Sequence, residues 1–473
     1  AGYTALDSNT TGSSNVAIGD TALTANTTAS NNTSLGYASM QYNTTGAVNV
    51  AVGTYALQVN TTGSANTAVG MQAMTANQTG YNGTGLGYQA AKNNTTGAQN
   101  TAVGTVALFS NTTGSSNVAV GTSSLYTNAT GNNNVAVGLE ALYYNTGAGN
   151  NVGIGYRALK TSTSGQNNVA IGVNAMTALT TASNNVAIGY EALASNTTAT
   201  NNVAIGYQAG KAITTGAQNT IIGLTAGDAI TTASDNTVLG QSALGENTTA
   251  SGNTAIGKSA LNSGSGGENN VAVGKDAMFN AGARSANTAV GHNAGSAITT
   301  GDNNTIIGRF NGNQGGLDIR TSSNHIVLSD GAGNPRLYML ANGALVSPQT
   351  QAQTTGAGAN VFISAGQFYR STSSLRYKNT INDATHGLAE LMTLRPVTYK
   401  GNSDGDTVFG GLIAEEVHNS GLTEFVEYSQ DDNGDDQPEA LYYSNMVSLC
   451  IKAIQEQQET ITALTARIEA LES

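Results

Sequence analysis

A glycine recurs every 17 residues through the first two thirds of this 473-residue chain, with no insertion or deletion between successive copies. The series runs from Gly2 to Gly308 and makes nineteen repeats. A short, fixed period is typical of solenoids, in which each repeat contacts only its two neighbours. The repeats therefore predict a rod, which favours a structural or adhesive fibre over a metabolic enzyme.

Residues 185–199 illustrate one repeat. Val186 and Ile188 alternate with a small residue, which predicts a short strand with one buried face. Gly189 follows and is expected to allow a positive φ or a tight corner. The length suits one coil of two short strands and two turns, and is too short for a strand plus a well-formed helix. We therefore predict a mainly β fold whose shaft is a parallel β-solenoid, or β-roll, of 17-residue rungs.

Two columns of apolar residues are expected to stack along this rod. The first column is the residue directly before each glycine, such as Ile188 before Gly189. The second column is the residue four positions after the glycine, such as Leu193. Three repeats lack the second column and place an isoleucine three residues later, in the pairs Gly210 and Ile213, Gly227 and Ile230, and Gly295 and Ile298. A large side chain lost at one position and restored nearby is what a narrow, filled interior requires.

Asparagine is the commonest polar residue at two positions of the repeat. Asparagines four residues before the glycine, such as Asn117 and Asn185, are expected to form a hydrogen-bonded ladder. The Asn-Thr-Thr triplets match the glycosylation sequon, but their recurrence at one turn position favours a structural role. The threonine rows resemble an ice-binding face, yet adjacent strand residues point to opposite faces and give no flat double row.

Composition excludes several functional classes. Charged residues make up 10% of the chain and form no basic patch, so we expect no nucleic-acid partner. The single cysteine, Cys450, excludes an intrachain disulfide framework. No apolar run reaches the roughly 20 residues of a membrane helix, so no membrane insertion is expected. We predict no cofactor and no metal site.

The Val-Ala-Ile-Gly core of the repeats, across about residues 1–312, resembles the head domains of trimeric autotransporter adhesins. The resemblance implies a left-handed parallel β-roll, three copies of which pack side by side. The period differs from that of the commonest adhesin heads, and the C-terminal membrane anchor of that family is not found. We therefore expect a shared architecture in a protein that is not an autotransporter.

Three domains are expected: a solenoid shaft at 1–316, a β connector at 317–372 and a third domain at 373–473. In the connector, 325–328 and 336–340 read as strands around a turn cluster at 330–335. His325 is a candidate functional residue by type alone, and a position on a strand surface is favoured because no partner motif accompanies it.

Residues 373–473 differ in kind, since they carry 17 of the 29 acidic residues and show helix signals. The segments 373–378, 391–399 and 411–417, followed by a terminal heptad helix, resemble the endosialidase-type C-terminal intramolecular chaperone, a self-cleaving peptidase domain. The family occurs on bacteriophage tail fibres and tailspikes and on some other trimeric fibres. The resemblance implies a small α+β domain that helps three chains to fold together and then cuts itself off.

By the pattern of this family, Ser373 is the nucleophile and Lys378 the base, and the cut lies between Thr372 and Ser373. A serine hydroxyl can attack the peptide bond before it only when a base takes its proton. Lysine serves as that base when burial or nearby positive charge lowers its pKa. The chain departs from the family at Ser374, where aspartate is usual.

Two further features of the last domain admit more than one interpretation. The acidic run 431–436 lacks the spacing of a calcium-binding loop and is expected to be a solvated turn. The last helix places Val447, Ile454, Ile461 and Ile468 on one heptad core position, and Cys450, Gln457, Leu464 and Leu471 on the other. This pattern predicts a coiled coil. Isoleucine with leucine often favours dimers, whereas both resemblances imply a homotrimer, which we expect here.

Together these features predict a homotrimeric phage tail fibre, located in the virion, that attaches to a glycan or protein receptor on the host cell surface. The alternative is a cellular surface adhesin or appendage subunit, extracellular or on the cell surface, that uses the same chaperone. A third possibility is that the rod is a passive spacer. The only enzymatic activity expected is a single self-cleavage, with no external substrate.

Overall fold

The computed structural model describes residues 2–263, 266–280, 282, 284–348, 380–401, 406–431 and 435–472, and the backbone of 361–364 and 367–370. The chain forms two compact units, residues 1–354 and residues 355–473. Each unit is described by itself.

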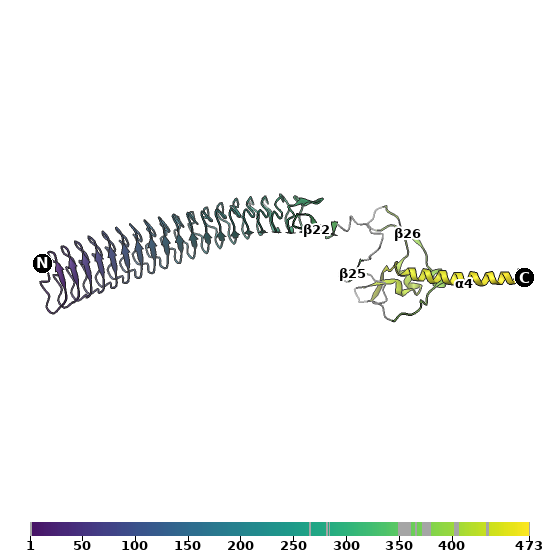
Figure 1. Cartoon of the computed structure of the whole chain (residues 1–473), viewed down its shortest axis with the longest axis horizontal. Helices are drawn as coiled ribbons and strands as arrows, with labels where there is room; N and C mark the ends of the chain where they lie inside the picture. Colours follow the sequence, from purple (N-terminus) through teal and green to yellow (C-terminus); the bar gives the residue numbers. More distant parts are fainter. Residues whose placement is uncertain are drawn as a thin grey trace. The chain divides into compact units, whose positions relative to one another are not determined.

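The first unit is a parallel β-solenoid, as the repeat predicts, and its coils follow one another along a gently curved rod (Figure 1). Each of its first eighteen strands is three residues long and begins 17 residues after the one before. The strands are β1 Val16–Ile18, β2 Thr33–Leu35, β3 Val50–Val52, β4 Thr67–Val69, β5 Thr84–Leu86, β6 Thr101–Val103, β7 Val118–Val120, β8 Val135–Val137, β9 Val152–Ile154, β10 Val169–Ile171, β11 Val186–Ile188, β12 Val203–Ile205, β13 Thr220–Ile222, β14 Thr237–Leu239, β15 Thr254–Ile256, β16 Val271–Val273, β17 Thr288–Val290 and β18 Thr305–Ile307.

Each strand pairs in parallel with the equivalent strand of the next coil, residue for residue. Val186, Ala187 and Ile188 of β11 lie opposite Val203, Ala204 and Ile205 of β12. Because every repeat has the same length, the register never slips, and side chains of one repeat position form a continuous column along the rod.

Each coil contains one strand and not the two that its length suggested. The segment that returns across the coil after the glycine has left-handed backbone angles at alternate residues, with φ of 52° at Glu191 and 51° at Leu193. Its amide groups still bond to both neighbouring coils, because Glu191 N donates to Val173 O at 2.9 Å and Leu193 N to Ala209 O at 3.1 Å. The return segment therefore stacks like a strand without being extended.

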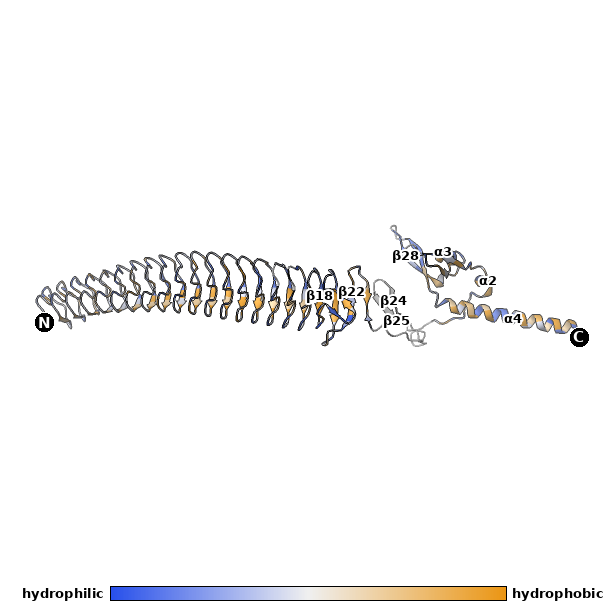
Figure 2. Cartoon of the chain, turned by 90° about the horizontal axis from the view of Figure 1, so that it is seen from above, coloured by the Kyte–Doolittle hydropathy of each residue, from blue (hydrophilic) through white to orange (hydrophobic). Residues whose placement is uncertain are grey.

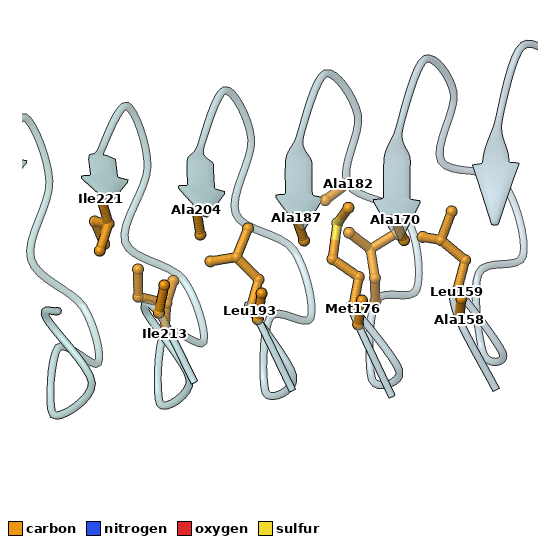
Figure 3. Packing of buried hydrophobic residues seen from close by; sticks show 14 of the residues in the cluster. Ala158, Leu159, Ala170, Met176, Ala182, Ala187, Leu193, Ala204, Ile213 and Ile221 are labelled. Carbon is orange, nitrogen blue, oxygen red and sulfur yellow. The ribbon is translucent and has the colours of Figure 1, made fainter. Parts of the chain in front are cut away.

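The interior of the coil is lined by the small central residue of each strand and by the leucine of the return segment (Figure 3). Ala187 and Leu193 are fully buried, whereas Val186 and Ile188 are partly exposed. The column before the glycine therefore stacks on the outer face of the sheet, while the column four residues after it fills the interior. A leucine already occupies the space, since a Cβ added to Gly153 would lie 3.2 Å from Leu142 Cγ.

The repeats that lack this leucine fill the gap in two ways. Ile213, Ile230 and Ile298 are fully buried, as the expected compensation requires. In the same coils the strand also carries a large central residue, Ile221 after Gly210, Val238 after Gly227 and Ile306 after Gly295, all buried. Thus the interior keeps its volume while the residues that supply it change.

Two ladders of buried asparagine run along the rod. The first is the predicted ladder, four residues before the glycine. In one of its rungs, the backbone N of Asn202 donates to Asn185 Oδ1 at 2.9 Å. A second ladder uses the first residue of the Asn-Thr-Thr triplets. Asn43 Nδ2 donates both to Asn26 Oδ1 at 3.0 Å and to Gly46 O of its own turn at 2.9 Å. Buried amides thus satisfy one another from coil to coil.

The sheet continues past the last 17-residue repeat. A short hairpin of β19 (Asn313–Gln314) and β20 (Leu317–Asp318) precedes β21 (Ile326–Ser329), which pairs in parallel with β18. Strands β22 (Pro335–Met339) and β23 (Leu345–Val346) then add antiparallel neighbours. Much of the segment that we expected as a connector therefore completes the sheet of the shaft.

The second unit contains short hairpins and helices. The hairpins are β24 (Val361–Ser364) with β25 (Gln367–Arg370), β26 (Val397–Tyr399) with β27 (Phe409–Gly411), and β28 (Val426–Gln430) with β29 (Asp436–Leu441). The helical elements are α2 (Leu388–Leu391), α3 (Ala414–Asn419), the 3-10 turn η2 (Thr423–Phe425) and α4 (Met446–Glu472). A small apolar core forms where α3, η2, β28 and the start of α4 meet, around Val417, Leu422, Phe425 and Leu449. The expected terminal helix is therefore present as α4.

Candidate functional site

The predicted self-cleavage site lies outside the described residues. Ser373, Lys378, Thr372 and Ser374 all fall within 371–379, so the distance between the predicted nucleophile and base is not part of the structure. What the structure describes is the scaffold that follows this segment, from residue 380 onward.

The two downstream motifs of the chaperone resemblance contact each other within this scaffold. The motif at 391–399 contains β26, and the motif at 411–417 begins at the end of its partner strand β27. The guanidinium of Arg395 forms an ion pair with the carboxylate of Glu416, and this hydrogen bond lowers the pKa of Glu416. Tyr443 Oη, just before α4, accepts a hydrogen bond from Leu412 N at 2.7 Å.

An open cleft of about 620 Å³ lies beside this contact, lined among others by Arg395, Tyr399, Ile413, Glu439 and Tyr443. Its walls come from β26, β29 and the segment before α3. The cleft combines two exposed tyrosine rings with charged side chains.

Helix α4 packs on its unit with one face of its first turns, where Met446, Leu449 and Ala453 are buried. Glu456 Oε2 accepts a hydrogen bond from Leu388 N of α2 at 2.7 Å, whereas another face of the helix carries apolar side chains that the described residues leave exposed from its start to its end. Ile454 is 64% exposed and Leu471 81%. The exposed apolar residues include Val447, Ile454, Ile461, Leu464, Ile468 and Leu471, all at predicted heptad core positions. Cys450 is also exposed.

The outer face of the shaft carries a second unpaired apolar surface, which we call the strand stripe. It consists of the third residue of each strand from β1 to β18, which is valine, isoleucine or leucine in all eighteen and is buried in none. Figure 2 shows these strands as a row of apolar segments along the rod. Ile18 is 51% exposed and Ile307 48%, so the stripe reaches both ends of the repeat region.

The glycosylation sequons of the repeats are structural, as their periodicity predicts. Most asparagines of the Asn-Thr-Thr triplets are fully buried, and Asn43, Asn60 and Asn111 are bonded to their neighbours in the second ladder. The threonine that follows is also engaged, because Thr44 Oγ1 donates to Thr61 O at 3.0 Å. The Nδ2 atom to which a sugar would be attached is thus buried and already donates two hydrogen bonds, so it is not accessible for glycosylation in the folded coil.

The prediction that His325 lies on a strand surface is wrong. It is 7% exposed and occupies the ladder position that asparagine holds in the repeats, with its backbone N donating to Asn304 Oδ1 at 2.9 Å. Its Nδ1 atom has no hydrogen-bond partner among the residues that the structure describes. The 21-residue step from β18 to β21 hides this equivalence in the sequence.

Sequence reasoning also missed an aromatic column on the return side of the coils. Phe109, Tyr126 and Tyr143 follow one another at intervals of 17 residues and stack with ring centroids 5.1 and 5.0 Å apart. The sequence contained this information, because the three aromatic residues recur at the same 17-residue interval as the glycines.

Within the described residues, no group of three or more histidine, cysteine, aspartate or glutamate side chains is placed to hold a metal ion. None of the helices in the described part of the chain has the length and apolar character needed to cross a membrane.

Comparisons with protein-family models, with curated proteins and with solved structures find no match to this chain.

Proposed function

We propose that this chain is a structural fibre protein, of the kind that forms phage tail fibres, whose copies assemble as a homotrimer and attach to a host cell surface. The observation that carries the proposal is the strand stripe. An apolar surface that runs on the order of 80 Å along a rod is far longer than the patches monomeric proteins expose. Association of copies through this stripe would remove its apolar side chains from water, which is energetically favourable.

The exposed side chains of α4 support the same assembly. Heptad core residues are stable when they insert between the side chains of neighbouring helices. Two separate surfaces, one in each unit, thus favour association of copies of the chain. The number three follows from the resemblance of both regions to trimeric fibres.

The C-terminal unit then acts as an assembly domain that is released once. In this reaction Ser373 Oγ attacks the carbonyl carbon of Thr372, and Lys378 Nζ accepts the hydroxyl proton. The Thr372–Ser373 peptide bond breaks, its amine takes a proton, and water hydrolyses the resulting ester. The proposal for this step rests on the family resemblance.

The assembly is tested by placing charges on the strand stripe. The double variant Ile154→Lys and Ile188→Lys puts ammonium groups on two coils of the stripe, and sedimentation equilibrium should show dissociation of the trimer. The matched control is Ser164→Lys with Thr198→Lys, at exposed turn positions of the same spacing. A wild-type chain that sediments as a monomer, or a stripe variant that stays as trimeric as the control, contradicts the proposal.

Cleavage is tested by intact mass under denaturing conditions. Freshly expressed wild type should give fragments that end at Thr372 and start at Ser373, while Ser373→Ala and Lys378→Ala stay whole. If wild type also stays whole, the self-cleavage is wrong and the domain is a retained assembly clamp. Ser374→Asp then tests whether this departure from the family pattern is the cause.

The alternative of a cellular surface adhesin or appendage subunit shares this assembly. It is favoured by the Val-Ala-Ile-Gly cores, since these resemble adhesin heads. The genes beside the coding sequence distinguish the two, because a phage fibre is encoded among virion genes.

A further inference from the structure

One column of the shaft carries three aromatic side chains in succession, with a lysine at each end. Five successive coils place Lys92, Phe109, Tyr126, Tyr143 and Lys160 at the same repeat position, five residues after the glycine. The ring planes of the central three are within 6° of parallel from one coil to the next. Lys92 Nζ lies 5.6 Å from the centroid of the Phe109 ring. We call these five residues the aromatic strip.

Further polar and aromatic groups border the strip at one end. The ring of Tyr144, which is 46% exposed, meets the Tyr143 ring edge to face at a centroid distance of 4.7 Å. Glu140 accepts from Lys160 Nζ at 2.9 Å and from Arg157 Nε at 2.8 Å, so this carboxylate holds two cations, of which Lys160 belongs to the strip.

The strip faces away from the strand stripe. Leu108, Leu125 and Leu142, which directly precede the three rings, are fully buried inside the coil. The rings come next along the return segment, are half-buried, and lie on the outside of the coil. The return segment lies across the interior from the strands, as Figure 3 shows in neighbouring coils. Association of copies through the strand stripe therefore leaves the aromatic strip uncovered.

The size and shape of the strip indicate what it can bind. A stable protein interface needs about 20 to 30 residues on each side. The strip is one side chain wide and is bordered by small polar residues such as Ser110 and Thr127. A linear chain of sugar rings matches this form, because each ring offers an apolar C–H face to an aromatic side chain and hydroxyl groups to tyrosine and lysine.

The charge of the region selects among glycans. Between residues 21 and 190 the only charged side chains are Lys92, Glu140, Arg157 and Lys160, which leaves a net charge of +2 around the strip. Among the described residues no carboxylate pairs with Lys92. Burial raises the pKa of Tyr143, helped by its neighbours Tyr126, Tyr144 and Glu140.

We propose that the aromatic strip binds an acidic glycan, whose sugar rings lie along the rod and whose anionic groups reach the lysines at its two ends. This inference rests on the proposed function, since it gives the host receptor a chemical class and a place on the shaft.

The test is a glycan array on which uronate, sialate and phosphate-bearing oligosaccharides stand beside neutral ones of equal length. Wild type should bind the acidic set at least about tenfold more tightly, and added salt should weaken this binding. Tyr126→Ala and Lys92→Gln should each weaken it about tenfold, while Tyr126→Phe keeps most of it. Tyr207→Ala is the matched control, because it removes a ring from the stacked pair with Tyr190 in a different column.

Absence of a preference for acidic glycans, or an equal loss in Tyr207→Ala, overturns the inference. If Tyr126→Ala unfolds, Lys92→Gln carries the comparison. Sedimentation of the same samples separates the two proposals. A trimer that binds no acidic glycan overturns the strip alone, whereas a monomer that binds through the strip overturns the trimeric assembly alone.

Discussion

At the scale of single residues, the glycine of each repeat meets two demands at once. Gly189 has a φ of 134°, a region that side-chain-bearing residues rarely adopt. A Cβ at this residue would also lie 2.3 Å from Gly206 O in the next coil. The sequence predicted a positive φ or a tight corner, and the first of these is present. The contact between coils was not, because it depends on how closely neighbouring corners stack.

Substitution of this glycine should therefore be costly. Gly189→Ala is expected to lower the free energy of unfolding by at least about 3 kcal/mol, since both backbone strain and a backbone clash oppose it. Gly331→Ala is the control, because no atom lies within 4 Å of its added Cβ. Thermal unfolding followed by circular dichroism checks both. Equal melting temperatures for the two variants would refute this explanation of the repeat.

Glu140 gives the shaft a small dependence on pH. Its hydrogen bonds to Lys160 and Arg157 hold the pKa of the carboxyl below its usual value. A carboxyl with a lowered pKa stabilises the folded state at neutral pH, and this contribution is lost as the pH falls through the folded pKa. Glu140→Gln should thus be less stable than wild type at pH 7, by less than about 1 kcal/mol, and this difference should shrink as the pH is lowered and the carboxyl of the wild type becomes protonated. If the stability difference between wild type and Glu140→Gln instead increased as the pH fell, the carboxylate would not be the stabilising form, and this account would be contradicted.

At the scale of the element, the alternation of residues predicted a strand with one buried face, but the column before the glycine, which we expected to stack inside the rod, faces outward. The reason is what lies across the coil. Leu193 and its equivalents already fill the interior, so only alanine, serine or glycine fits opposite, and the larger residues face outward. The signal was present in the sequence, because large central residues occur only in coils that lack the leucine, as Ile306 does after Gly295. Without recognising that the leucine of the return segment and the central strand residue share one space, the outward direction of the strand stripe could not be deduced.

This pairing predicts a rescue. Gly295→Leu alone should destabilise the coil by about 1 to 3 kcal/mol, because Ile306 Cδ1 and Ile298 Cδ1 lie 3.3 and 3.4 Å from the added Cβ. Addition of Ile298→Asn and Ile306→Ala restores the common repeat and should recover most of the loss. The backbone is no obstacle, since Gly295 has a φ of 62° and Leu193 one of 51°. Chemical denaturation measures all three proteins. A triple variant no more stable than the single one would show that the compensation is not steric.

At the scale of the whole molecule, the rod, its rungs and the terminal helix followed from the period of the glycines and from the heptads. The assembly did not, because a single chain contains no partner to bury Ile18, Ile307 or Ile454. The reaction of Ser373 and Lys378 also stays a prediction, since both residues lie outside the described part of the chain. The proposed fibre thus rests on surfaces that one chain exposes and three chains can cover.

The most direct test is the cross-section of the shaft in averaged electron cryomicroscopy images of the intact protein. The account predicts three coils around a common axis, with the strand stripes packed inward and the Phe109, Tyr126 and Tyr143 column on the outside. A single isolated coil, or three coils with their strands facing solvent, would contradict it.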